Sequence, residues 1–232
     1  METLDMLAND LANASTAGYK GDREFYGLYV SSGALDPFGS PGSAATLPVI
    51  ERSWTDFSQG TLVTTGNPLD LAISGRGFFA VNGPAGPLYT RNGGFQLSST
   101  GVVTTMEGYP LRLVGGAPLQ TTSSSPLEVN KDGTVIQDGA VLGQLEIVDF
   151  KDLADLSKQG AGYFTSRGSI TPAAASGFEL RQGRLESSNV ASAEGAVRLV
   201  NVIRQSEMLQ KAIWLATDMN RRSVEEVARV GS

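Results

Sequence analysis

The chain has 232 residues, with 28 Gly and 10 Pro but no Cys and no His, and its formal net charge is −6. That length suits one large domain or two small ones, with a core large enough to fold without disulfides. The missing Cys and His remove thiolate and imidazole chemistry, and the dilute acidic charge is unlike the clustered Lys and Arg of nucleic-acid-binding surfaces. The composition therefore argues against most enzymes, against metal centres and against nucleic-acid partners, and it favours a structural or binding protein.

The first segment predicts a short helix over residues 1–14. Leu4, Leu7 and Leu11 share one helical face, and a helix of this length is marginal alone, so we expect it to pack against a partner. Asn9 and Asn13 lie one turn apart. They are either solvated, with an Asn as a cap, or hydrogen-bonded across a helix–helix contact where they set the register.

The middle of the chain predicts short strands. All ten prolines and 22 of the 28 glycines fall within residues 31–180, and both residue types punctuate strands and are costly inside helices. Short apolar runs at intervals of about 8–12 residues favour an antiparallel sheet or small barrel over a βαβ fold. We predict strands at 69–73, 78–81, 88–91, 134–136, 140–142 and 145–150, and loops or an extended arm at 31–48 and 121–126.

Motifs in this middle region carry no recognisable chemistry. Residues 75–80 match G-x-G-x-x-A, but the following Val-Asn-Gly-Pro forbids the helix that a dinucleotide site needs, so we predict a glycine-permitted hairpin turn. Asp132 and Asp138 each precede a Gly, as turn residues do, and no calcium-loop pattern is present. We expect no catalytic residue, no cofactor, no metal and no small-molecule substrate.

The final segment, from about residue 190 to residue 230, predicts a long helix. A 4-3 spacing of mostly apolar residues indicates a coiled-coil-like seam, and further apolar residues beside it make the apolar surface wider than one seam requires. At 1.5 Å per residue the helix spans roughly 60 Å, more than a small β domain can cover, so it requires partners. The seam comprises Leu199, Val202, Ser206, Leu209, Ile213, Ala216, Asn220, Ser223, Val227 and Val230.

Short sequence blocks occur in order along nearly the whole chain, at residues 7–13 with 16–20, 57–62 with 65–73, 75–79 with 89–91 and 94–95, and 182–190. Together these blocks resemble bacterial flagellar rod and hook proteins. Within that family the similarity is greatest to proximal rod subunits, with distal rod subunits as the near alternative. Asp10 stands where the family usually has a second Asn, and the first helix of the family normally begins well before this motif.

The resemblance implies a mainly β fold flanked by terminal helices that pair in a coiled-coil-like bundle. We expect a terminal helical, polymerising unit of residues 1–30 with 187–232, an arm or linker at 31–68 and a β-rich outer domain at 69–186. Since the first helix is short, we expect part of the long helix to have an exposed apolar face, or one covered by another subunit.

The implied function is that of a structural subunit of the basal-body rod, which polymerises through its terminal helices into the axial tube that transmits torque. The implied partners are homologous rod and hook subunits and the flagellar type III export apparatus, with self-association. The implied location is the periplasm-spanning rod, reached without a cleaved signal, and the sequence start shows no basic region followed by an apolar core. Subunit-interface candidates are Leu4, Leu7, Asn9, Leu11, Asn13, Asn189, Leu199, Val202, Leu209, Ile213 and Ala216.

The competing hypothesis is a free-standing β-rich carbohydrate-binding or phage-tail-like module with a helical oligomerisation tail. It accounts for the Gly- and Pro-rich middle and for the C-terminal seam. It does not account for the Asn-containing N-terminal motif or for the order of the blocks. An enzyme ranks third, because we find no carboxylate pair suited to glycan hydrolysis.

Overall fold

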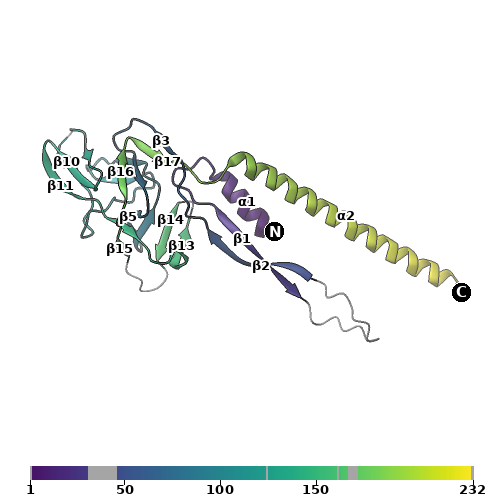
Figure 1. Ribbon diagram of the computed structural model, residues 1–232. Coiled ribbons are helices and arrows are strands. Elements are labelled where there is room, and N and C mark those ends of the chain that lie inside the picture. The colour runs from purple at the N-terminus through teal and green to yellow at the C-terminus, as the bar shows by residue number, and fades with distance from the viewer. Residues whose placement is uncertain (1, 31–45, 124, 161, 167–171, 231–232) are drawn as a thin grey trace. The chain divides into compact units, whose positions relative to one another are not determined.

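The computed structural model describes residues 2–30, 46–123, 125–160, 162–166 and 172–230, and it describes the side chains of fewer (Figure 1). The chain divides into two compact units. A helical unit comprises Met1–Ala12 and Ala191–Ser232, and a β unit comprises Asn13–Val190.

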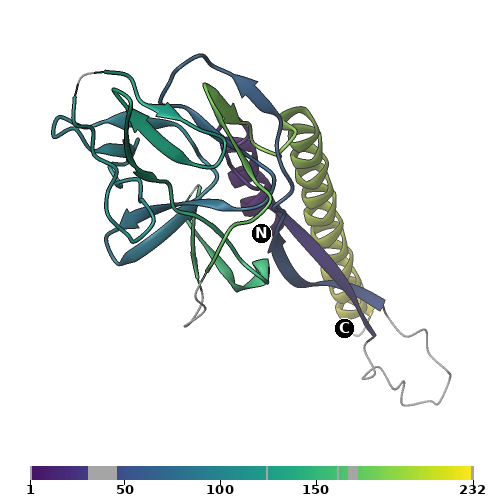
Figure 2. The same cartoon turned by 60° about the vertical axis from the view of Figure 1, so that its left-hand side comes forward.

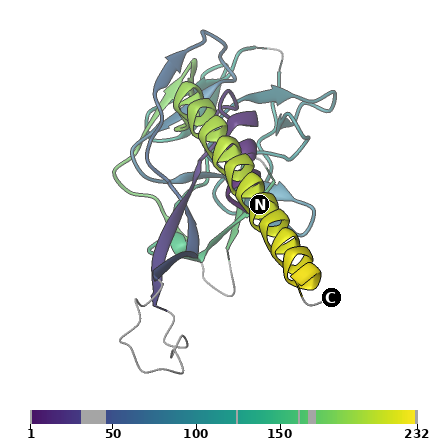
Figure 3. The same ribbon diagram turned by 90° about the vertical axis from the view of Figure 1, so that its right-hand side faces the viewer.

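The helical unit contains α1 (Glu2–Ala12) and α2 (Ser192–Val230). The amide of Gly195 donates to the carbonyl of Ala191 in the first turn of α2, where Glu194 complements the helix dipole. α1 lies beside the N-terminal part of α2, as Figures 1 and 3 show. With 11 residues against 39, α1 is about 16 Å long and α2 about 58 Å. Neither helix, over its described residues, is apolar enough to cross a membrane.

The β unit is built from short strands, and every strand pairing that the structure describes is antiparallel. This confirms the predicted mainly β class. The strands are β1 (Asp22–Val30), β2 (Thr46–Thr55), β3 (Leu62–Thr64), β4 (Leu71–Ser74), β5 (Phe78–Gly83), β6 (Gly86–Thr90), β7 (Phe95–Leu97), β8 (Val103–Thr105), β9 (Glu128–Val129), β10 (Thr134–Gln137), β11 (Ala140–Gln144), β12 (Ile147–Asp149), β13 (Leu156–Gln159), β14 (Tyr163–Ser166), β15 (Ala173–Ala174), β16 (Glu179–Gln182) and β17 (Arg184–Glu186), with a 3₁₀ turn at Leu153–Asp155.

The central sheet has six strands in the order β13-β14-β6-β5-β12-β15. Both of its faces are covered, because alternate residues of β5 enter different cores: Phe79 and Val81 pack in the larger one, and Phe78 and Ala80 in the smaller. The smaller core is largely aromatic, with edge-to-face ring pairs. Burial on both faces explains why this strand is a continuous apolar run instead of an alternating one.

Among the residues that the structure describes, the remaining strands form one three-stranded sheet, in the order β11-β10-β9, and four two-stranded sheets. β1 and β2 form a two-stranded ribbon, seen side by side in Figure 2, with an irregularity between Phe25 and Tyr26. β3 pairs with β17, β4 with β16, and β7 with β8. Within residues 31–68, predicted as an arm, residues 31–45 lie outside the described residues and the remainder includes β2 and β3.

Two predicted turns had different outcomes. Asp138, with φ of 50°, and Gly139, with φ of 76°, join β10 to β11 as a tight hairpin, which confirms the turn predicted at this Asp-Gly pair. The hairpin predicted at residues 75–77 was wrong, because β4 pairs with β16 whereas β5 pairs with β6 and β12. The chain changes sheets there instead, at Gly75 and Gly77, whose φ values of 107° and 124° L residues rarely adopt.

Candidate functional site

The first candidate surface is the seam of α2. The half-buried positions near its start are spaced three or four residues apart, at Gly195, Leu199, Val202 and Ser206. A Cβ atom added at Gly195 would contact Leu11 Cδ1 at 3.9 Å, which places α1 on this face. The same seam continues to Leu209, Ile213 and Ala216, and these side chains are exposed.

Further apolar residues lie beside the seam on α2. At about 100° per residue, Met208 and Leu215 fall about 100° from the adjoining seam residues and Met219 about 60° from Ala216, whereas Val197 falls roughly half a turn from Leu199. All four are more than half exposed, as are Ile213 and Leu209, at 67% and 58%. Large exposed apolar patches are unusual on monomeric proteins and mark interaction surfaces. The predicted seam positions Val227 and Val230 lie outside the residues whose side chains are described.

The predicted site residues of the first helix are only partly gathered together. Leu4, Leu7 and Leu11 are half-buried on α1, whereas Asn9 is exposed. Asn13 lies just beyond the end of α1, where its side-chain oxygen accepts a 3.3 Å hydrogen bond from the hydroxyl of Thr16. The helix thus ends at Ala12, two residues before the predicted end at residue 14.

Asn189 has a defined place inside the β unit. Its side-chain amide donates to the carbonyl of Asp56 at 2.7 Å, and its side-chain oxygen accepts from the amide of Gly21 at 2.9 Å. Its backbone amide donates to the carbonyl of Tyr19 at 3.3 Å. One side chain therefore connects three segments that are far apart in sequence.

A buried charge cluster, here called the anchor, lies beside Asn189. It consists of Lys20, Arg91 and Glu186. Lys20 Nζ is 2.5 Å from Glu186 Oε1, and Arg91 Nη1 is 3.2 Å from Glu186 Oε2. The side chains of Lys20 and Glu186 have no solvent exposure. Burial lowers the pKa values of both Lys20 and Arg91, and the carboxylate of Glu186 opposes each shift.

Hydrogen bonds to the backbone complete the anchor. Lys20 Nζ also donates to the carbonyl of Ser58 at 2.7 Å, and the amide of Gly60 donates to Glu186 Oε1 at 2.9 Å. Arg91 Nη2 donates to the carbonyl of Gly75 at 2.8 Å, and the Arg91 guanidinium lies 5.3 Å from the centre of the Phe78 ring. A buried ion pair is tolerated only with such additional bonds, because desolvation of the charges is costly.

Two glycines allow the backbone to pass close by. A Cβ atom at Gly18, whose φ is 67°, would lie 2.3 Å from the carbonyl carbon of Arg91. A Cβ atom at Gly60 would lie 2.0 Å from the carbonyl oxygen of Ser187. Neither position accepts a side chain without backbone movement, so both glycines are required by the packing of the anchor.

The anchor is where the sequence blocks of the resemblance converge. Lys20, Gly60 and Glu186 come from three different blocks, and Gly75 and Arg91 come from two parts of a fourth. Sequence reasoning did not single out the three charged residues as a cluster. The available signal was that each is a charge inside a block otherwise rich in Gly and in apolar or small polar residues.

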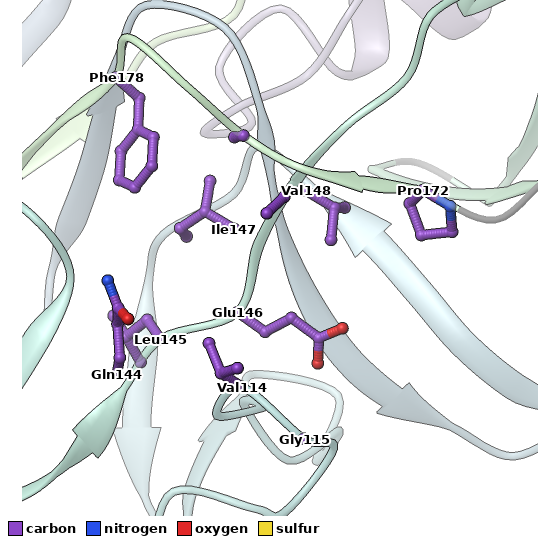
Figure 4. A pocket seen from close by; sticks show the side chains of 11 residues that line it. Val114, Gly115, Gln144, Leu145, Glu146, Ile147, Val148, Pro172 and Phe178 are labelled. Carbon is purple, nitrogen blue, oxygen red and sulfur yellow. The ribbon is translucent and has the colours of Figure 1, made fainter.

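An open hollow of about 220 Å³ also lies in the β unit (Figure 4). Its lining is mostly apolar, with Val114, Ile147 and Phe178 among the residues drawn. The one acidic side chain of the lining, Glu146, is bound to Arg112 Nε at 2.8 Å. No group of three or more acidic residues suited to a metal ion occurs in the part of the chain that the structure describes.

Comparison with known proteins decides the family. A family model described as the flagellar hook protein FlgE/F/G D1 domain matches residues 72–137. A flagellar basal-body rod protein FlgF from Caulobacter vibrioides is 30% identical over 98% of this chain and 92% of its own length. The chain belongs to the flagellar basal-body rod proteins.

Both named branches of these rod proteins are represented among the relatives. FlgF of Rhizobium meliloti is 31% identical over 87% of this chain and 81% of its own length. FlgG of Buchnera aphidicola (Acyrthosiphon pisum) is 31% identical over 93% of this chain and 90% of its own length. The chain is thus a FlgF-like rod protein with FlgG as the alternative, a structural protein of the flagellar basal body, and the carbohydrate-binding or phage-tail interpretation is not supported.

Proposed function

We propose that this rod protein polymerises through its terminal helices, and that the exposed part of the α2 seam is the surface by which it does so. The observation that carries the proposal is the exposure of Leu209, Ile213 and Ala216 on the same face that α1 covers one to two turns earlier. A continuous apolar seam that is covered at one end and open at the other has room for a further helix.

Energetics support this assignment. Burying one large apolar side chain contributes about 1.5–3 kcal/mol, so a few seam residues per subunit supply a substantial contact. Met208, Leu215 and Met219 lie beside the seam and widen this contact surface. A surface wider than one seam can contact more than one neighbouring helix, and heterologous contacts of this kind generate open helical assemblies when the rotation does not close.

The same proposal covers the packing within the helical bundle and the assembly of the rod. α1 and α2 form a coiled-coil-like bundle with helices of neighbouring rod or hook-family subunits, and Asn9 and Asn13 set the register at its start. The packing residues are Leu199, Val202, Leu209 and Ile213. The assembled tube spans the periplasm and transmits torque. Its subunits arrive through the flagellar export apparatus, and no nucleic acid, cofactor or small-molecule substrate takes part.

The double variant Leu209→Asp with Ile213→Asp tests the proposal. Charged carboxylates in an apolar helix–helix contact are strongly unfavourable, so we expect loss of self-association in sedimentation velocity and loss of motility in a complemented deletion strain. The β unit should keep its near-ultraviolet circular dichroism signal.

Val141→Asp is the matched control, since Val141 is similarly exposed, at 66%, but lies on β11 of the β unit. It should leave association and motility at wild-type levels. Normal motility of the double variant would contradict the proposed interface.

A further inference from the structure

The two ends of the β unit are attached to it mainly by polar contacts. Among the described residues, the buried apolar core runs from Leu71 to Leu180, and Tyr19 is its one member outside that range. The entering segment, residues 16–21, and the leaving segment, residues 184–189, instead exchange backbone hydrogen bonds. The amide of Gly18 donates to the carbonyl of Glu186 at 2.7 Å, and that of Asn189 donates to the carbonyl of Tyr19 at 3.3 Å.

The carboxylate of Glu186 accepts hydrogen bonds from three segments that are far apart in sequence. Glu186 Oε1 accepts from Lys20 of the entering segment and from the amide of Gly60, and Oε2 accepts from Arg91, which follows β6. The cluster holds two cations and one anion. Without Glu186, the two buried cations would lose the one carboxylate that contacts both of them.

We propose that the anchor is a two-ended latch: the entering and leaving segments dock and release together, as one cooperative unit that opens independently of the sheet core. Neither segment can leave alone. Departure of the entering segment separates Lys20 from Glu186, and departure of the leaving segment takes away the carboxylate of Glu186 that both Lys20 and Arg91 contact. Leaving a buried charge uncompensated costs far more than breaking a solvated pair.

The core does not depend on these segments for its own closure. Its strands pair among themselves, and its amides, such as those of Leu111 and Leu119, bond to carbonyls within residues 103–111. Proteins commonly open in such cooperative subglobal units. In sequence the latch adjoins both junctions with the helical unit, at Asn13 and Val190, so its opening frees both connections at once.

Amide hydrogen exchange of the full chain tests the latch. In Glu186→Gln we expect exchange about 100-fold faster or more at Gly18, Ser187 and Asn189, at both ends alike, with the rates of Leu111 and Leu119 within about threefold of wild type. Glu179→Gln is the matched control: it removes the same charge from an ion pair of 2.6 Å with Arg181, but one whose side chains are about half exposed. Its exchange rates should not change.

Lys20→Met keeps the test decisive if Glu186→Gln does not fold. This variant alters the entering segment alone and leaves Glu186 paired with Arg91, so we expect a smaller acceleration, about tenfold, at Gly18 and equally at Ser187 and Asn189. Acceleration confined to the entering segment, or acceleration that includes Leu111 and Leu119 to the same extent, would overturn the latch.

Discussion

The β unit and the long helix treat apolar and charged side chains in opposite ways. The β unit buries its large apolar residues on both faces of the central sheet and also buries charged side chains, among them the three of the anchor, which neutralise one another in part. α2 leaves Leu209, Ile213 and Met219 in solvent. The β unit therefore has its stabilising contacts within one chain, whereas the exposed part of the long helix has few such contacts and, under the proposed function, gains them from other subunits.

Of the substitutions that test this comparison, one in the sheet core is expected to lower the free energy of unfolding most. Phe79 on β5 is fully buried and packs edge-to-face on Phe95 at 5.3 Å. Phe79→Ala should lower the free energy of unfolding of the β unit by about 3–5 kcal/mol, because it removes apolar burial and leaves a cavity. Urea denaturation followed by near-ultraviolet circular dichroism measures the change, and a loss below about 1 kcal/mol would contradict the packing described.

A much smaller effect is expected from the same kind of truncation on α2. In a dilute chain, Ile213→Ala should change the free energy of unfolding by less than about 0.5 kcal/mol, because Ile213 is exposed. Leu199→Ala, on the half-buried part of the seam, should cost about 1 kcal/mol in helix stability. Thermal melts at 222 nm measure both, and equal costs at the two positions would show that α1 does not cover the seam selectively.

The order of those two effects should reverse when subunits associate. At high protein concentration Ile213→Ala should weaken self-association, since the side chain is then buried, by about 2 kcal/mol per contact. Sedimentation equilibrium gives this value. Association of the variant at wild-type strength would place the subunit contact elsewhere.

The smallest expected effect is the change with pH in the contribution of Lys20 to the free energy of unfolding. Burial lowers its pKa in the folded state below 10.5, so between that lowered pKa and 10.5 the unfolded chain binds more protons than the folded chain. The contribution of Lys20 to the free energy of unfolding must therefore rise with pH in this window. The free energy of unfolding of wild type minus that of Lys20→Met, measured by urea denaturation from pH 7 to pH 10.5, isolates the contribution of Lys20 from that of the tyrosines, which both proteins share. A difference that falls as pH rises would contradict the lowered pKa of Lys20.

Local pattern predicted those features that depend on neighbours in sequence. The 4-3 spacing located α2 and its seam, and the apolar runs located β4, β5, β6, β10, β11 and β12. The Asp138-Gly139 turn was also predictable, since its left-handed conformation is a property of those residue types. The turn at residues 75–77 was misjudged, because which strand β4 joins depends on β16, about a hundred residues away.

The anchor could not be predicted from local sequence pattern either. Lys20, Arg91 and Glu186 are ordinary charges in sequence, and no periodicity relates positions separated by 71 and 95 residues along the chain. Their meeting follows from how β3 pairs with β17 and β6 with β5.

The sequence by itself determined that this chain is a Gly- and Pro-rich β region between two helical ends, that one helix carries more apolar surface than it can bury, and that its blocks belong to flagellar rod proteins. Only the tertiary structure decided which part of the seam is covered and where the two ends of the β unit are fastened. The physical reason is that backbone preferences and apolar periodicity act over a few residues, whereas burial and charge neutralisation depend on segments that become neighbours only after folding.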